Sequence, residues 1–270
     1  MLHQDLHTHS TFDDGKSTLR EMAEGALRAG LHAVGFSVHS PLPFANDWAC
    51  PAARLPDFLR ETAQLREEYR GRLAIYTGIE LDGESTLELA PFDYVIGSIH
   101  HLRCGDRLFA VDESAETSRA MAAAFGSADR AAEAYFTQYA RLAADPQVDI
   151  VGHFDLLLKF HERDPLFDPA SPAYLAAAEQ AMAQLVAAGK LFELNTGAIS
   201  RGYRTTPYPD ETLLRMLCAM GGRITLNSDA HSADVLGFRF AEAAALARRC
   251  GFREMWRFDG ARFVPLPLEG

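Results

Sequence analysis

Short apolar runs alternate along the chain with longer segments in which apolar residues recur at helical spacing. The runs of strand length are residues 2–6, 33–38, 73–79, 94–99, 150–152, 191–194, 224–226 and 254–258. The segments of helical period are residues 18–28, 56–69, 128–143, 172–188, 211–220 and 241–250. Strands that alternate with helices through short connections predict a parallel sheet.

The number of these units predicts whether the sheet is open or closes into a barrel. Seven or eight strand–helix units in 270 residues favour a closed barrel over an open sheet. A chain of this length can bury one full core, so we predict a single α/β domain over residues 1–270.

Capping residues and long connections add detail to this prediction. Ser17 is the expected N-cap of the first helix, and Gly30 follows its predicted end. The segments 41–54, 103–125 and 159–171 are longer than typical connections, and each follows a strand. They should therefore lie at the carboxyl face of the barrel, where barrel enzymes carry their active sites.

Histidine or a carboxylate follows six of the predicted strands. The nine groups, in chain order, are His7, His9, Asp14, His39, Glu80, His100, His153, Asp229 and His231. Parallel strands of a barrel place their carboxyl ends around one rim, so these side chains should converge. Imidazole and carboxylate together suit zinc, manganese or iron. Nine such ligands fit two or three ions.

Each of these groups alone has an ordinary interpretation. An H-x-H pair can be a surface or capping pair, and an isolated histidine such as His39 or His153 is commonly a hydrogen-bonded structural residue. Glu80 could cap a helix or pair with an arginine. Recurrence at six strand ends is what favours a polynuclear metal centre. His101 directly follows His100 and is expected to point away from the site.

Charge and cysteine usage limit the partners. The net charge of −11 argues against general affinity for nucleic acid or anionic membranes, although metals could still hold a small anionic substrate. The four cysteines are widely spaced without a C-x-x-C pair, which is typical of reduced residues. No signal peptide or membrane-length apolar run is evident. We expect a cytoplasmic protein, monomeric or a small homo-oligomer.

These motifs, in this order, resemble the polymerase and histidinol phosphatase (PHP) superfamily. The motifs are the H-x-H-x-x-x-x-D-G opening, His39, Glu80, G-S-I-H, G-H and S-D-A-H, and they span nearly the whole chain. The narrower likeness is to the histidinol-phosphate phosphatases, through FDYVIGSIHHL followed by VDESAE, GHFDLLLKF and FELNTGAISRGYRTTPYP. Two departures are Asp82-Gly83, where a bulky aromatic residue is expected, and Lys159, where arginine is more usual.

The resemblance implies a distorted seven-stranded (β/α)7 barrel with three divalent metal ions. It assigns the first ion to His7, His9, Glu80 and Asp229, the second to Glu80 as a bridge with His100 and His153, and the third to Asp14, His39 and His231. Asp14 takes a place that histidine fills in some relatives.

The implied activity is hydrolysis of L-histidinol phosphate to L-histidinol and phosphate, a step of histidine biosynthesis. We expect a hydroxide that bridges two metals to attack in line, without a phosphoenzyme. Glu80, Asp229 and His231 are the expected catalytic side chains.

Phosphate and the rest of the substrate need further contacts. Lys159, Arg201 and Arg204 are candidates for binding phosphate, although each could instead pair with a surface acid. Asn195 is expected to orient either the substrate or a ligand. Acceptors for the substrate amine and imidazole are expected among Asp82, Glu113 and Asp155.

Two alternatives remain open. The first is another phosphoesterase of the superfamily, acting on nucleotides, phosphotyrosine or a nucleic acid end, although the acidic balance weakens the nuclease. The second is a non-catalytic metal-binding or regulatory module, which would be expected to lack some of the ligands.

Overall fold

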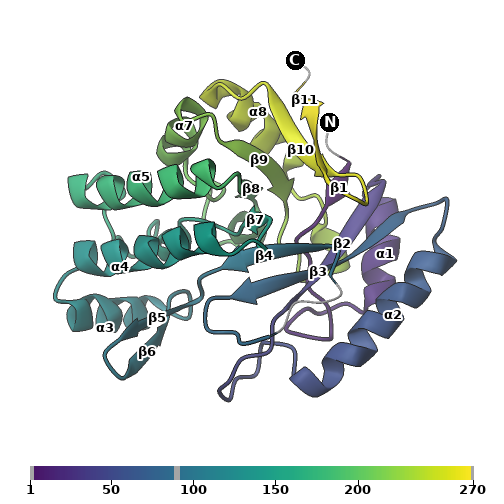
Figure 1. The fold of residues 1–270 in the computed structure, drawn as a ribbon, viewed down its shortest axis with the longest axis horizontal. Coiled ribbons are helices and arrows are strands. Elements are labelled where there is room, and N and C mark those ends of the chain that lie inside the picture. Colours follow the sequence, from purple (N-terminus) through teal and green to yellow (C-terminus); the bar gives the residue numbers. More distant parts are fainter. Residues whose placement is uncertain (1–2, 88–91, 269–270) are drawn as a thin grey trace.

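A seven-stranded parallel sheet forms the centre of the computed structural model, which describes residues 3–87 and 92–268 (Figure 1). The strands, in spatial order, are β1 Gln4–Asp5, β2 Ala33–His39, β3 Ala74–Asp82, β4 Tyr94–Ser98, β7 Ile150–Val151, β8 Leu191–Asn195 and β9 Arg223–Asn227. A parallel bridge between Thr8 and Ala230 joins the segments that follow β1 and β9. The sheet is thereby nearly closed, which confirms the predicted barrel. The predicted first strand began at Leu2, which lies outside the described residues.

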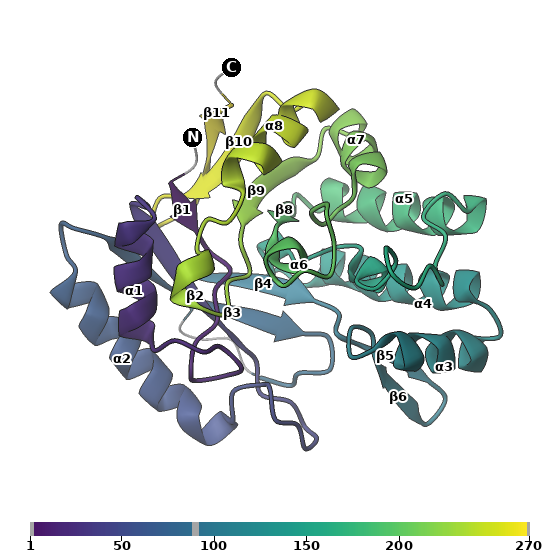
Figure 2. The ribbon, with the colours of Figure 1, turned by 180° about the vertical axis from the view of Figure 1, so that it is seen from behind.

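Helices cover the outside of this barrel. They are α1 Leu19–Arg28, α2 Leu55–Glu68, α3 Ala115–Phe125, α4 Ala128–Arg141, α5 Pro172–Ala187, α6 Gly197–Ser200, α7 Glu211–Ala219 and α8 Phe240–Cys250. Figures 1 and 2 show α1 and α2 on one side of the barrel and α3, α4 and α5 on the other. No described helix has both the length and the apolar character needed to cross a membrane.

The N-cap of α1 differs from the prediction. Thr18, not Ser17, caps the helix: its hydroxyl accepts from the Glu21 N–H, and the Glu21 carboxylate accepts from the Thr18 N–H. This reciprocal arrangement requires Glu three residues after the cap, a spacing that Thr18 has and Ser17 lacks. The Ser17 hydroxyl instead accepts from the N–H of Ala233.

The predicted strand at residues 254–258 forms, but outside the barrel. It is β10 Glu254–Phe258, which pairs antiparallel with β11 Phe263–Pro267. Phe258 packs with Leu6 and Tyr94 in an apolar cluster that includes side chains from the barrel strands. The hairpin therefore adds to the core, and the barrel has seven strands.

Tyr94 is fully buried, and two glycines make room for its ring. A Cβ atom on Gly35 or Gly78 would come within 2.1 or 2.2 Å of Tyr94 side-chain atoms. Glycine on β2 and β3 is thus a packing requirement of the barrel.

The segment 103–125, expected to be a long connection, contains regular secondary structure. The hairpin of β5 His101–Cys104 and β6 Arg107–Ala110 turns at Gly105, and α3 follows with Ser114 as its N-cap. The short strands and the tightly spaced turn gave too little periodicity for a prediction. Their place after β4 brings the end of β6 to the site.

Candidate active site

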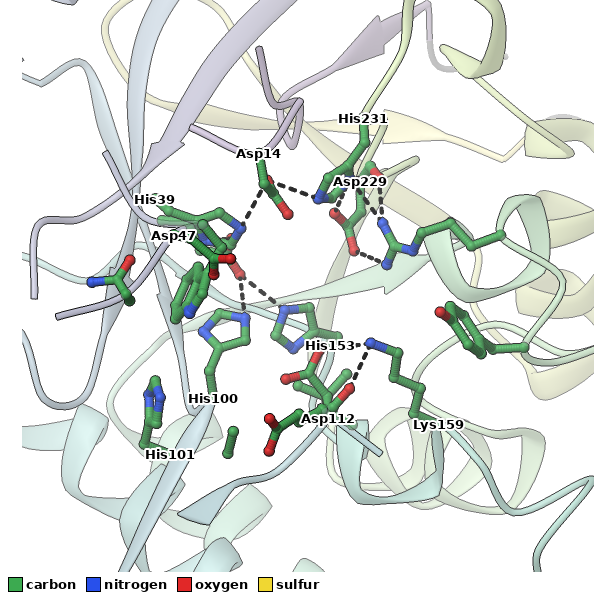
Figure 3. A pocket seen from close by; sticks show the side chains of 18 of the residues that line it. Asp14, His39, Asp47, His100, His101, Asp112, His153, Lys159, Asp229 and His231 are labelled. Carbon is green, nitrogen blue, oxygen red and sulfur yellow. Dashed lines mark hydrogen bonds and ion pairs between the residues drawn. The ribbon is translucent and has the colours of Figure 1, made fainter. Parts of the chain in front are cut away.

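The nine predicted ligands converge at the carboxyl ends of the barrel strands. His7 and His9 follow β1, His39 ends β2 and lies in register with Glu80 on β3, and the remaining ligands follow their strands in the predicted order. A pocket of about 500 Å³ opens over this rim. In Figure 3, Asp14, His39, His100, His153 and Asp229 point toward a common space. We call the rim formed by these nine ligands the metal side.

Glu80 lies at the centre of the metal side and is 1% exposed. Its Oε2 atom lies 3.1 Å from His7 Nε2 and 2.9 Å from His39 Nδ1. Its Oε1 atom lies 2.9 Å from His153 Nε2 and 3.4 Å from His100 Nε2. The two oxygens therefore face different groups of histidines, which is the geometry that a bridging carboxylate needs.

Asp229 and Asp14 link the other ligands to this centre. Asp229 Oδ1 lies 3.4 Å from His9 Nε2 and 3.5 Å from His231 Nδ1. Asp14 Oδ1 lies 3.2 Å from His231 Nε2 and 3.7 Å from His39 Nε2. Asp229 has a positive φ of 49°, which aspartate tolerates better than most residues.

Four groups of side chains place their ligand atoms within 4.8 Å of one another. They are His9, Asp14, His39 and His231; His7, His9 and Glu80; His39, Glu80 and His100; and His7, His153 and Asp229. The first two groups resemble two of the expected subsites. The other two divide the ligands differently from the expected second subsite, since His39 joins Glu80 and His100 while His153 groups with His7.

The chemistry of these atoms fits divalent cations. The buried atoms His7 Nε2, His9 Nε2 and Glu80 Oε2 face the cluster without making a hydrogen bond. Buried polar atoms normally have partners, so unpaired imidazole and carboxylate atoms that face one another form a donor set that fits a divalent cation. This cluster can bind metal.

The electrostatics of the cluster also indicate that it can bind a cation. Burial opposes charge on His9, but the Asp13 carboxylate outweighs it and raises the pKa of His9 to about 10. Burial likewise opposes charge on Glu80, but His7, His39 and His100 hold the pKa of Glu80 well below its ordinary value. Several carboxylates thus remain ionised together, and a cation or protons must compensate their charge.

Three carboxylates stand behind the ligand histidines, and their role was not predicted from the sequence. The pairs are Glu193 with His7 at 2.8 Å, Asp13 with His9 at 2.8 Å and Asp82 with His100 at 3.1 Å, each to Nδ1. Glu193 also accepts from the His153 N–H at 2.7 Å. A hint existed: Glu193 is a charged residue within an otherwise apolar strand pattern, which requires buried partners.

The three side chains predicted to bind phosphate differ in whether they line the pocket. Arg201 and Lys159 line the pocket. Arg201 donates to Asp229 Oδ2 at 2.9 Å, and Lys159 donates to Asp112 Oδ2 at 2.9 Å. Arg204 does not line the pocket: it is buried, 3.5 Å from Asp155.

Asn195 also lies behind the pocket lining. Its Nδ2 donates to Glu193 Oε1 at 2.8 Å and lies 3.4 Å from Asp229 Oδ2. Of the two roles expected for Asn195, this position favours orienting a ligand over contact with substrate.

Comparison with known proteins places this geometry in a family. The PHP domain family model matches residues 5–197. A Deinococcus radiodurans protein named "Probable histidinol-phosphatase" is 31% identical over 93% of both chains. The chain belongs to the PHP family. The Bacillus subtilis histidinol-phosphatase is 28% identical, covering 93% of this chain and 100% of the relative.

A solved structure shares the fold of this PHP protein. It is the histidinol phosphate phosphatase of Lactococcus lactis, complexed with zinc, L-histidinol and phosphate. The TM-score is 0.73 at 23% identity, over 97% of this chain and 99% of that one.

The rest of the pocket lining is built mainly from connections between the barrel strands, and we call it the loop side. Its main members are Phe44, Asp47, Trp48, Glu113, Lys159 and Tyr203. The Trp48 ring stacks on His101 with centroids 5.8 Å apart and meets His39 edge-on at 4.7 Å. The loop side of this PHP protein thus combines aromatic rings with carboxylates.

Three expectations about side chains near the loop side were wrong. His101 lines the pocket, 3.4 Å from Asp82, because β4 ends at Ser98 and strand alternation does not continue to residue 101. Asp155 is fully buried beside Arg204, outside the pocket lining. Asp82 faces the two histidines at 100 and 101 and does not line the pocket either.

Proposed function

We infer that this PHP protein is a metal-dependent phosphomonoesterase that hydrolyses L-histidinol phosphate to L-histidinol and phosphate. The observation that carries the inference is one pocket with two chemically different sides. A converging set of histidines and carboxylates shares this pocket with aromatic and acidic side chains from the connections. Relatives named histidinol-phosphatase match over nearly the full length of the chain, which supports the same assignment.

The phosphoryl group belongs on the metal side. Divalent ions held by these nine ligands, three in the arrangement we propose, would provide a nucleophile at neutral pH and offset the phosphoryl charge. Glu80, Asp229 and His231 are the ligands that we propose as essential for the reaction. Arg201 is placed to reach a phosphoryl oxygen, because its guanidinium already lies beside Asp229 and His231.

The lining of the pocket supports direct hydrolysis. Among the described residues that line it there is no serine, threonine or cysteine that could form a covalent intermediate, and most of its histidines and aspartates are the side chains that we propose as metal ligands. Lys159 adds a second positive charge, 4.8 Å from the Tyr203 ring centroid. Its partner Asp112 keeps this ammonium at the pocket wall, where it can attract an anionic substrate.

The remainder of histidinol phosphate is a cationic amine and an imidazole, which suit the loop side. Of the three acceptors expected from the sequence, only Glu113 lines the pocket. We propose that Glu113, together with the Asp47 carboxylate of the same pocket lining, binds the amine. Trp48 and Phe44 offer ring faces and edges to the imidazole.

The test is a substrate comparison with the metal-loaded protein. We expect kcat/KM for L-histidinol phosphate to exceed that for p-nitrophenyl phosphate, phosphotyrosine and AMP by about a hundredfold, since only the first engages both sides of the pocket. The variant Asp229→Asn, measured in parallel, reports any contaminating phosphatase. Equal or lower efficiency on L-histidinol phosphate would show that the substrate assignment is wrong.

A further inference from the structure

The ligand histidines differ in what lies behind the ring nitrogen that faces away from the cluster. Behind His7, His9 and His100 stands a carboxylate, from Glu193, Asp13 and Asp82 in that order. A carboxylate in this position accepts the Nδ1 proton, so that Nε2 presents its lone pair to a metal. It also makes the imidazole a stronger donor to the metal.

At His231 a neutral backbone carbonyl and a cation lie in that place, and the Asp229 carbonyl oxygen is 3.0 Å from His231 Nδ1. Arg201 Nη1 lies 2.9 Å from His231 Nδ1 and donates to the Asp229 carbonyl oxygen at 3.0 Å. A guanidinium stays charged and has no acceptor, so Arg201 adds nothing to the support that the Asp229 carbonyl gives His231 as a ligand. Its positive charge also repels any cation bound by His231.

Solvent exposure sets His231 and Asp14 apart from the most buried ligands. The side chains of His7 and His9 are 0% exposed and that of Glu80 is 1% exposed. By contrast, the side chain of His231 is 20% exposed and that of Asp14 is 35% exposed. We call Asp14, His39 and His231 the outer subsite and the other six ligands the inner ligands. Water competes with the outer subsite for its ion more easily.

We propose that the cluster binds its ions with unequal affinity: the outer subsite holds an exchangeable ion, and Arg201 is the residue that weakens it. The inner ligands, of which His7, His9 and His100 have supporting carboxylates, hold the tightly bound ions. The inference rests on the proposed function only in taking this cluster as the metal centre of the enzyme.

Manganese binding can test this without any substrate. Mn²⁺ is added to chelator-treated protein, and the free ion is measured from its electron paramagnetic resonance signal. We expect one binding step at least tenfold weaker than the others. Asp14→Asn should abolish only that weak step. Arg201→Gln should tighten it about tenfold, the range seen for groups behind metal ligands.

Two variants test whether the positive charge of Arg201 or its structural role determines the affinity of the weak step. Arg201→Lys keeps the positive charge and should leave the weak step weak. Arg163→Gln removes an arginine that donates to the Gly202 carbonyl outside the pocket lining, and should change no step.

Several results would overturn the proposal. One is equal affinity for all ions in the unmodified protein, and another is loss of a tight step in Asp14→Asn. A third is that Arg201→Gln leaves the affinity of the weak step unchanged or lowers it. If Arg201→Gln lowers the affinity of all steps together, Arg201 acts only by holding Asp229. Because the ion counts involve no substrate, a failure to hydrolyse histidinol phosphate would count against the proposed function alone.

Discussion

On the metal side of the pocket, side chains come from strand ends and are mostly buried, whereas on the loop side they come from connections and are mostly half-buried or exposed. A metal-side residue such as His7 has partners on both sides of its ring, Glu193 at 2.8 Å and Glu80 at 3.1 Å. A loop-side residue such as Trp48 makes only ring contacts with its neighbours in the pocket. Chemistry is thus fixed by the barrel, while substrate preference is set by segments that can change without disturbing the metal ligands.

The largest effect should come from the centre of the metal side. Glu80→Gln removes the charge that faces two groups of histidines, so we expect kcat/KM to fall by about a thousandfold or more, with loss of bound metal. Steady-state kinetics and metal analysis measure both. Glu24→Gln, on the exposed face of α1, is the matched control and should change neither. Activity within tenfold of the parent would contradict a central role for Glu80.

A residue one step behind the ligands should have a smaller effect. Glu193→Gln keeps the size of the side chain but weakens its hold on His7 and on the His153 N–H. We expect metal affinity to fall about 10- to 100-fold, measured by chelator competition. A loss of folding without a change in metal affinity of the surviving protein would mean that Glu193 supports only the barrel.

The metal side should also respond to pH in a defined direction. Despite burial, Asp13 raises the pKa of His9 to about 10, so the metal-free protein holds a proton there at pH 7. This pairing stabilises the metal-free fold below the ordinary histidine pKa of about 6.5, and the contribution is lost as pH rises toward 10. Metal must displace the proton, so apparent affinity should rise with pH by up to about tenfold per unit for each proton released.

Mn²⁺ titrations at pH 6.5, 7.5 and 8.5 measure that dependence. Trp48→Ala, a change on the loop side, should leave the slope unaltered. An affinity that levels off above pH 7 would show that the histidines carry no extra proton.

On the loop side, the expected effect is smaller and concerns substrate choice. Glu113→Gln should raise KM for L-histidinol phosphate about tenfold, because a charge-assisted hydrogen bond to the amine is lost. Its kcat for p-nitrophenyl phosphate should stay within about twofold. Glu116→Gln, on the exposed first turn of α3, is the control. Equal losses on both substrates would place Glu113 in the chemistry and remove the distinction between the two sides.

The same division governs what sequence could predict. Most metal-side ligands stand in a strand or shortly after its end, so periodicity located them together with the barrel. Glu193 and His7 lie 186 residues apart, and their contact follows only from the order in which strands pair. The loop side depended on the β5–β6 hairpin and on the course of residues 41–54, neither of which has a periodic signal. Arg204 and Asp155, read as pocket residues, satisfy each other in the buried interior instead.

The central claim is that one pocket combines a metal side for the phosphoryl group with a loop side for the amine and imidazole. A crystal structure of the protein with Mn²⁺, inorganic phosphate and L-histidinol tests it most directly, with anomalous scattering to locate the ions. We predict ions among the nine ligands, phosphate between them and Arg201, and the histidinol amine within hydrogen-bond distance of Glu113. Ions elsewhere, or histidinol bound away from the loop side, would contradict the account.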